Sequence, residues 1–405
     1  MLKFFKKHIW ILVIIMAILT VPQSLSTQAQ LKMRVLVTGV AIDKISDEYA
    51  VTAQVVMPSM SNDGGGSARV NLVTAQGMTM AECFNQVAFS LGKTIGLSHL
   101  SYVMIGESLR GENLSVVLDF FLRNRYIDNS VGIFLAEGSG KEEITKTKYF
   151  ELGTAIGLQK QFLYKQTASN GIMVQLLDFL NGMYNPSKSG MISYIKIYDE
   201  SIMGQDEKEN VTDGGLSSND LLGRFVYRNK IGYFKDGVQV GAFEDEQAII
   251  GVIMLNSQCQ EMCFNARNVN DELYNNADVN VFIGSKKVQI RAKFQNGQPV
   301  VDINIEFGVA NVREIKSSSK SRADYNVYSN FLTDTLKESI RVQTIDAINA
   351  AINQAKADNV DVFEFINMLH RSDVQTYRQY KKENGLDAIL QNSIINIDVS
   401  IKKIN

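Results

Sequence analysis

The clearest pattern in the chain is a pair of alternating segments on either side of Asn296-Gly297. Apolar and polar residues take turns at every second position there, and Asn-Gly favours the tight turn of a β-hairpin. The apolar positions are Val288, Ile290, Ala292 and Phe294 before the turn, and Val301, Ile303, Ile305, Phe307 and Val309 after it. We predict an antiparallel hairpin with one apolar face. Alternation at Ile395, Ile397, Val399 and Ile401 predicts a final strand in the same sheet.

A second strand pair is predicted near the start of the chain. Residues 35–42 are strand-like, and apolar residues then alternate with smaller or polar ones over residues 49–57. Residues 43–48 suit the turn between them. Residues 61–67 contain three consecutive glycines and read as a plain loop.

Helical periodicity follows this hairpin. Thr79 is a candidate N-cap, with Glu82 three residues later as in a capping box. Val87, Leu91 and Ile95, with Phe84 and Ala88 beside them, predict the buried stripe of this helix. Residues 102–105 read as a strand, 114–122 as a helix and 131–136 as a strand. This β-α-β-α-β alternation predicts a sheet with helices on a face.

The remaining patterns predict a multi-domain α+β protein with mixed or antiparallel sheets flanked by helices. Helices are expected at residues 154–164 and 173–184, and a strand at 192–198. Residues 199–220 carry seven acids and one lysine and read as a linker. We therefore expect an N-terminal α+β domain over residues 31–198 and a C-terminal α+β domain over 221–405. A small middle domain could lie within 221–275.

The C-terminal domain is expected to begin with two strands, at residues 224–228 and 230–234. A long helix should follow the central hairpin, because apolar residues recur there at helical spacing. Its apolar positions are Tyr328, Phe331, Ile340, Ile345, Ile348, Ile352 and Ala355.

The first 30 residues have the order of an export signal or an N-terminal membrane anchor. Three lysines precede an unbroken apolar run at residues 9–21, and a short polar stretch ends at Ala29. A helix of 13 residues is ~20 Å long, against a hydrocarbon core of ~30 Å. This shortness favours cleavage over retention, although both remain open. The rest of the chain is expected outside the cytoplasmic membrane.

Charge and cysteine content narrow the function classes. The exported part has 38 basic and 43 acidic residues without a basic cluster, which gives no footprint for nucleic acid. Cys83, Cys259 and Cys263 are too few for a disulfide framework, and we expect small buried hydrophobes, although Cys259 and Cys263 could close a bridge in a loop. Because none of the three lies near the apolar run, we predict no lipid attachment site.

The search for catalytic chemistry gives weak candidates. Gly138-Ser139-Gly140-Lys141 resembles the end of a P-loop but lacks the first glycine and the final Ser or Thr. His99 and His370 are the exported histidines, and a hydrogen-bonded structural role is expected for His99. The acids at 244–246 suit the first turn of a helix running to Met254. We predict no catalytic, cofactor-binding or metal site, and no enzyme.

Several segments, in order, resemble the Ger(x)C family, the C subunits of spore germination receptors. They are Gly39-Val-Ala-Ile-Asp-Lys, Tyr49-Ala-Val-Thr-Ala-Gln-Val-Val-Met-Pro, Gly77 to Thr79, Leu97-Ser-His99-Leu, Gly106-Glu107, Leu118-Asp119 with Arg123, Gly223-Arg-Phe-Val, and the run from Tyr233 to Gln247. The resemblance covers residues 33–405. Family members typically carry a lipidated cysteine after the signal, and this chain has none there.

The resemblance implies a non-enzymatic extracytoplasmic subunit of a nutrient germinant receptor in spore germination. Its partners would be the integral-membrane A-type and B-type subunits, at the outer face of the cytoplasmic (inner spore) membrane. It also implies a three-domain α+β architecture, without cofactors or catalytic residues. Which surface contacts the partners is not indicated. An exported solute-binding or envelope-assembly protein unrelated to sporulation is the alternative, and a secreted hydrolase using two facing carboxylates is a third.

Overall fold

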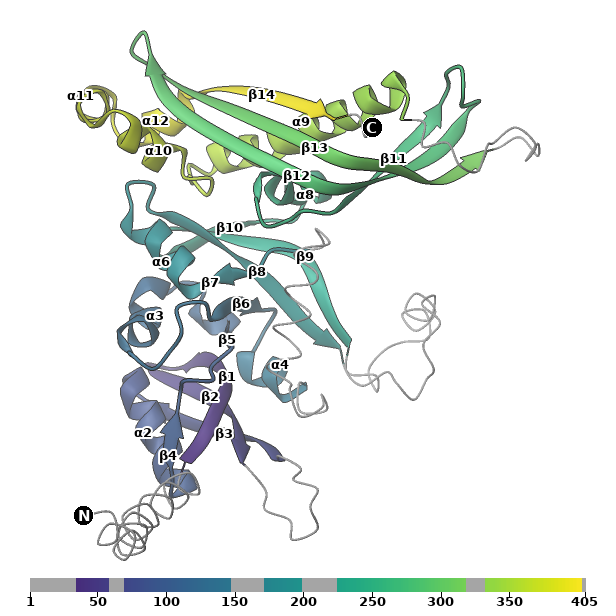
Figure 1. Cartoon of the computed structure of the whole chain (residues 1–405). Coiled ribbons are helices and arrows are strands. Elements are labelled where there is room, and N and C mark those ends of the chain that lie inside the picture. The colour runs from purple at the N-terminus through teal and green to yellow at the C-terminus, as the bar shows by residue number, and fades with distance from the viewer. Residues whose placement is uncertain (1–33, 58–68, 147–170, 199–223, 318–331, 403–405) are drawn as a thin grey trace, which may run out of the picture.

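The computed structural model describes residues 34–57, 69–146, 171–198, 224–317 and 332–402. Two sheets lie one beyond the other, and each carries its own helices (Figure 1). Several predictions fall outside these residues. They are the helix at 154–164, the linker at 199–220, the glycine loop at 61–67, the N-terminal segment, and Tyr328 and Phe331 of the long helix. Within the described ranges, no helix is both long and apolar enough to cross a membrane.

The first sheet is mixed and has ten strands, in the order β10-β9-β8-β6-β5-β1-β2-β3, with β4 beside β1 and β7 beside β6. The strands are β1 (Arg34–Ile45), β2 (Glu48–Met57), β3 (Arg69–Gly77), β4 (Thr94–Gly96), β5 (Tyr102–Ile105), β6 (Gly132–Ala136), β7 (Val174–Gln175), β8 (Ser189–Tyr198), β9 (Arg224–Lys235) and β10 (Val238–Phe243). Strand β1 is antiparallel to β2 and parallel to β5, which confirms the predicted first hairpin.

Helices cover both faces of this sheet. Helices α2 (Met80–Leu91), α3 (Leu114–Arg123) and α6 (Leu176–Tyr184) lie over one face, and α4 (Gly140–Lys146) lies over the other (Figure 1). A short 3-10 turn, Glu107–Leu109, precedes α3. Successive side chains of β5 point to opposite faces of the sheet. Val103 and Ile105 belong to the larger hydrophobic core on one face, whereas Tyr102 and Met104 belong to the smaller core on the other.

The second sheet has four strands, in the order β11-β12-β13-β14. They are β11 (Met262–Val269), β12 (Ala277–Gln295), β13 (Gln298–Ser317) and β14 (Ile394–Ile401), and the helices around them are α8 (Glu246–Leu255), α9 (Asp334–Ala357), α10 (Phe365–Ser372), α11 (Val374–Asn384) and α12 (Asp387–Gln391). The predicted hairpin is confirmed, because Asn296 and Gly297 both have positive φ, at 51° and 78°. The predicted final strand is β14, which runs parallel to β13.

Helix α8 joins the two halves. It packs closely against α9, and a Cβ atom on Gly251 would lie 2.0 Å from the carbonyl oxygen of Ala347. The buried ammonium group of Lys286 donates to the last carbonyls of α8, at 2.8 Å to Ile253 and 2.7 Å to Met254. Burial lowers the pKa of Lys286 to about 8.

The fold class is confirmed, and several boundaries differ from the prediction. The first sheet continues past residue 220, because β8 and β9 pair antiparallel and β10 follows β9. The two strands predicted at 224–228 and 230–234 are one strand. Helix α2 ends at Gly92, whose φ of 59° stops it, so Ile95 lies in β4 and not in the helical stripe. Helix α6 starts at Leu176, after β7.

Candidate functional site

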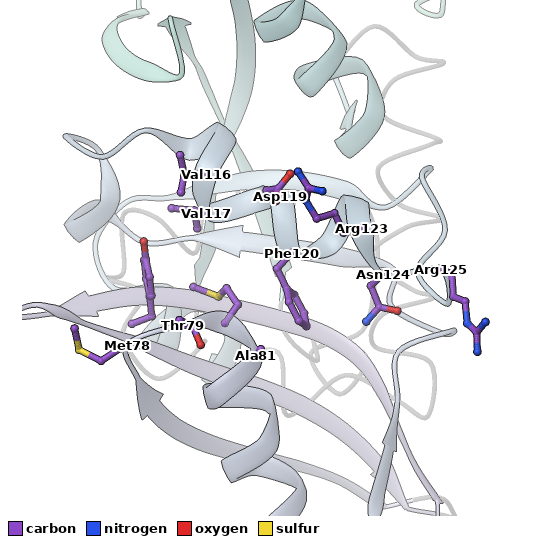
Figure 2. Close-up of a pocket in the computed structure, with 12 residues that line it drawn as sticks. Met78, Thr79, Ala81, Val116, Val117, Asp119, Phe120, Arg123, Asn124 and Arg125 are labelled. Atoms are coloured by element: carbon purple, nitrogen blue, oxygen red, sulfur yellow. Dashed lines mark hydrogen bonds and ion pairs between the residues drawn. The ribbon is translucent and has the colours of Figure 1, made fainter.

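A surface hollow lies between α2 and α3, and we call it the α2–α3 groove (Figure 2). Its volume is about 700 Å³. Its lining is Tyr49, Met78, Thr79, Met80, Ala81, Val116, Val117, Asp119, Phe120, Arg123, Asn124 and Arg125. The residues come from the start of α2, from α3 and from the loop after it. The groove is therefore a feature of two helix ends that are held over one sheet.

Capping fixes the two helices that form the groove. The hydroxyl of Thr79 accepts a hydrogen bond from the backbone amide of Glu82 at 3.2 Å, and the Glu82 carboxylate accepts from the amide of Met78 at 2.9 Å. This confirms the predicted N-terminus of α2. The side chain of Asn113 caps α3 by accepting from the amide of Ser115 at 2.9 Å.

Aromatic rings close the floor of the groove. Phe84 of α2 stacks on Phe120 of α3 with 5.1 Å between ring centroids, and Phe121 meets Phe120 edge to face at 5.4 Å. Beneath them, the buried thiol of Cys83 donates to the carbonyl of Tyr49 at 3.4 Å. Burial raises the pKa of Cys83 to about 11, so this thiol stays protonated and is a packing residue.

The rim of the groove combines apolar side chains with arginines. Met78 is 59% exposed and Val116 is 68% exposed, although each sits beside a well-packed core. Arg123 donates to Asp119 at 2.5 Å, one helical turn away, and this hydrogen bond raises the pKa of Arg123. Arg125 points away from the groove centre in Figure 2. The rim thus offers apolar contacts with a cationic end.

A second hollow of about 440 Å³ continues from the first. The two hollows share Ala81, Phe120 and Asn124. The second one extends to β4 and to Arg34 at the start of β1. Arg34 is the charged residue in its lining. The concave surface therefore runs along α2 toward the end of the molecule where β1 begins.

The P-loop-like segment at 138–141 does not form a phosphate site. Its amides are occupied by the carboxylate of Asp43, which accepts from Gly140 and from Lys141, each at 2.8 Å. The hydroxyl of Ser139 donates to the same carboxylate at 3.2 Å. An internal anion therefore fills the position that a phosphate would need.

The other chemical candidates are far apart in the fold. His99 is exposed. The Ser101 hydroxyl donates a hydrogen bond to the backbone carbonyl of His99, not to its imidazole. The expected structural role of a hydrogen-bonded imidazole is therefore not supported. His370 packs edge to face on Tyr377 at 4.8 Å in the other half. Across the described ranges, no group of three or more His, Cys, Asp or Glu could hold a metal ion.

The acids at 244–246 begin a helix, as predicted. Asp245 is the N-cap of α8 and accepts from the amide of Ala248 at 3.0 Å. All three cysteines are free. Cys83 and Cys259 are buried as expected, whereas Cys263 is exposed because it lies on the outer side of β11, and the prediction was wrong for that residue.

Sequence reasoning did not identify the α2–α3 groove. Met78, Thr79, Asp119 and Arg123 line the groove, and they belong to segments that resemble the family. The available signal was an apolar residue, Met78, just before the N-cap of α2, and another, Val116, on the exposed side of α3. Bringing these residues together requires the tertiary structure.

Comparison with known proteins gives matches over both halves of the chain. Residues 27–197 match the family described as spore germination protein N-terminal domain. Residues 229–405 match the family described as spore germination B3/GerAC-like, C-terminal. The two matches leave an interval, residues 198–228, that includes the whole acidic segment.

Two proteins of Bacillus subtilis (strain 168) are similar over shorter stretches. Spore germination protein B3 is 30% identical over 111 residues, which cover 27% of this chain and 29% of that protein. The protein YfkR is 30% identical over 113 residues, which cover 26% of this chain and 29% of that protein. The alignments therefore span less than a third of either relative.

A solved structure shares the fold. The crystal structure of the GerBC protein aligns with a TM-score of 0.51 at 16% sequence identity, over 91% of this chain and 97% of that chain. At this identity the likeness concerns the fold.

Proposed function

This chain belongs to the Ger(x)C family of spore germination proteins, and we propose that it is a non-enzymatic, extracytoplasmic subunit of a nutrient germinant receptor. The observation that carries the proposal is the match of both halves to the two domain families of spore germination proteins. The fold shared with the GerBC protein supports it over nearly the whole chain. The basic and apolar N-terminal segment supports a place at the outer face of the membrane.

A non-enzymatic role agrees with what the buried ionisable groups do. Asp43 holds the start of α4, Asp361 holds the start of α10, and Lys286 holds the end of α8. Each of these groups is engaged by backbone atoms of a helix end. Their hydrogen-bonding capacity is therefore used in structure and not presented to a substrate.

The α2–α3 groove is our candidate for the contact with an integral-membrane subunit. Met78 and Val116 are both exposed at one hollow, and apolar side chains gathered on a surface can mark a protein contact. A fitting occupant is an extracytoplasmic segment with apolar side chains toward the groove.

The proposal is tested by germination and by complex assembly in the native host. Deletion of the gene should impair nutrient-triggered germination and leave vegetative growth unchanged. In the complemented strain, Val116→Asp should reduce recovery of the chain with the receptor's membrane subunits, because it places a charge in the apolar groove. Val342→Asp is the matched control, since Val342 is 44% exposed on α9, far from the groove.

Two outcomes would count against the proposal. Normal germination of the deletion strain with every nutrient, without a paralogue to compensate, would remove the receptor role. Full assembly of the Val116→Asp variant would leave the receptor role intact and exclude the groove as the contact.

A further inference from the structure

The end of the molecule where β1 begins has an unusual surface, which we call the basal pole: Arg34, Phe89, Lys93, Arg125 and Tyr126. Phe89 lies near the C-terminal end of α2 and is 89% exposed. Strand β4 follows α2 and pairs with the first residues of β1, with Arg34 opposite Thr94. In Figure 1, this is the lower end of the molecule, where β4 and α2 lie. Packing within the described residues does not explain a phenylalanine this exposed on a helix.

Three of the five residues of the basal pole are cations, and none of the five is an acid. From Cys83 to Gly106 the chain contains no Asp or Glu, while Lys93 lies in the middle of that stretch. Arg34 lines the adjoining hollow, whose other lining residues are uncharged. Arg125 lies over the ring of Tyr126, with 4.8 Å between the guanidinium carbon and the ring centroid, and donates to its hydroxyl at 2.6 Å. The pole therefore combines cations with two exposed aromatic rings.

When the N-terminal apolar run is retained, the position of the pole along the chain places it near a membrane. The apolar run ends at Val21 and β1 begins at Arg34, so 12 residues separate them. Fully extended, that connection spans at most roughly 45 Å. Arg34 is the first residue of the first sheet, so the basal pole is the part of the fold that this short connection reaches first.

We propose that the basal pole rests on an anionic lipid surface, with Phe89 and Tyr126 in the interfacial layer and Arg34, Lys93 and Arg125 near the headgroups. Aromatic rings are favoured at the boundary of water and hydrocarbon. Basic side chains are attracted to anionic lipid within a Debye length of the surface. The inference rests on the proposed place at the outer face of the membrane. The contact would orient the α2–α3 groove toward the extracytoplasmic parts of membrane subunits.

A tryptophan placed at the pole reports on this contact directly. Trp10 is the single tryptophan of the chain, so Trp10→Phe gives a background without tryptophan. The full chain carrying Trp10→Phe and Phe89→Trp is reconstituted into vesicles of phosphatidylglycerol and phosphatidylcholine with acyl-chain-brominated lipid. The control carries Trp10→Phe and Val342→Trp. Both chains keep the same apolar run, so they differ only in where the reporter lies.

We expect blue-shifted emission and strong bromolipid quenching for the reporter at position 89, and water-like, unquenched emission at position 342. Replacing Arg34, Lys93 and Arg125 together with Gln should reduce the quenching at position 89 to the level in pure phosphatidylcholine. Equal emission and quenching at the two positions would overturn the proposal. Quenching that appears only when receptor subunits are added would also overturn it, because the pole would then be a protein interface. The groove variants decide the receptor role separately.

Discussion

The hydroxyl of Ser187 donates a hydrogen bond of 2.6 Å to the buried carboxylate of Asp361, which lies 174 residues later in the chain. The same carboxylate accepts from the amides of Phe365 at 2.9 Å and Ile366 at 2.7 Å, in the first turn of α10. The amide of Asp361 donates to Ser189 at 3.1 Å. This bond network connects the loop before β8 to the C-terminal helices, and it is one of the contacts that fix the two halves together.

The Asp361 carboxylate should make stability depend on pH. Burial raises its pKa from 3.8 to about 6, with a smaller contribution from Glu364, and its hydrogen bonds oppose the shift. The folded state therefore binds the proton more tightly than the unfolded state. This contribution to stability is present below pH 4 and is lost as pH rises through 6.

The variant Asp361→Asn should remove that pH dependence. The free energy of unfolding of the wild type minus that of the variant is expected to fall by up to ~3 kcal/mol between pH 4 and pH 7. Urea unfolding at several pH values measures it, with the exposed Asp398→Asn as control. A difference that stays constant over this range would show that Asp361 is ionised throughout.

The turn of the central hairpin gives a test of backbone strain alone. Gly297 has a φ of 78°, and a Cβ atom there would meet nothing within 4 Å. Gly297→Val should therefore destabilise the C-terminal half by ~1 kcal/mol or more through positive φ, without a steric clash. Thermal unfolding measures the loss, and Gln295→Val in the adjacent strand is the control. An unchanged melting temperature would mean that the turn can adopt another geometry.

The crossing of α8 and α9 should tolerate only glycine at one position. A Cβ atom on Gly251 would lie 2.0 Å from a backbone oxygen of α9, which cannot move as a side chain does. Gly251→Ala is expected to cost ~1–3 kcal/mol, as for overpacked cores. Gly111→Ala is a suitable control, because no atom lies within 4 Å of its Cβ position. If both variants have the same denaturation midpoint as the wild type, α8 and α9 do not pack as closely as the structure shows.

Local features were predictable from the sequence, whereas long-range ones were not. The turn at Asn296 and the cap at Thr79 depend on residues within a few positions, so pattern and turn chemistry identified them. The extension of the first sheet depends on β9 pairing with β8 across residues 199–223, which no local pattern encodes. The α2–α3 groove likewise requires Met78 and Val116 to come together in space. The sequence indicated that residues 138–141 are not a nucleotide site. It could not indicate which group occupies the backbone amides of this segment.

That occupant, Asp43, leads to the last prediction. Its carboxylate is 97 residues from Gly140 in sequence, yet it fills the start of α4, and a Cβ atom on neighbouring Gly106 would lie 1.9 Å from its Oδ1 atom. Two segments that resemble the family, one from Gly39 to Lys44 and the other Gly106-Glu107, therefore meet at the start of α4. Asp43→Ala should leave the Gly140 and Lys141 amides without their acceptor and cost ~1–3 kcal/mol.

The Asp43 prediction can be separated from a simple charge effect. Asp47→Ala, in the exposed turn after β1, removes the same charge and should change the free energy of unfolding by less than ~0.5 kcal/mol. Denaturant unfolding of both variants measures the difference, and added phosphate provides a second readout. If Asp43 acts as the internal anion, phosphate should stabilise Asp43→Ala and leave the wild type unchanged, because binding to the folded state raises stability. Equal stability of the two variants would show that α4 does not need the carboxylate.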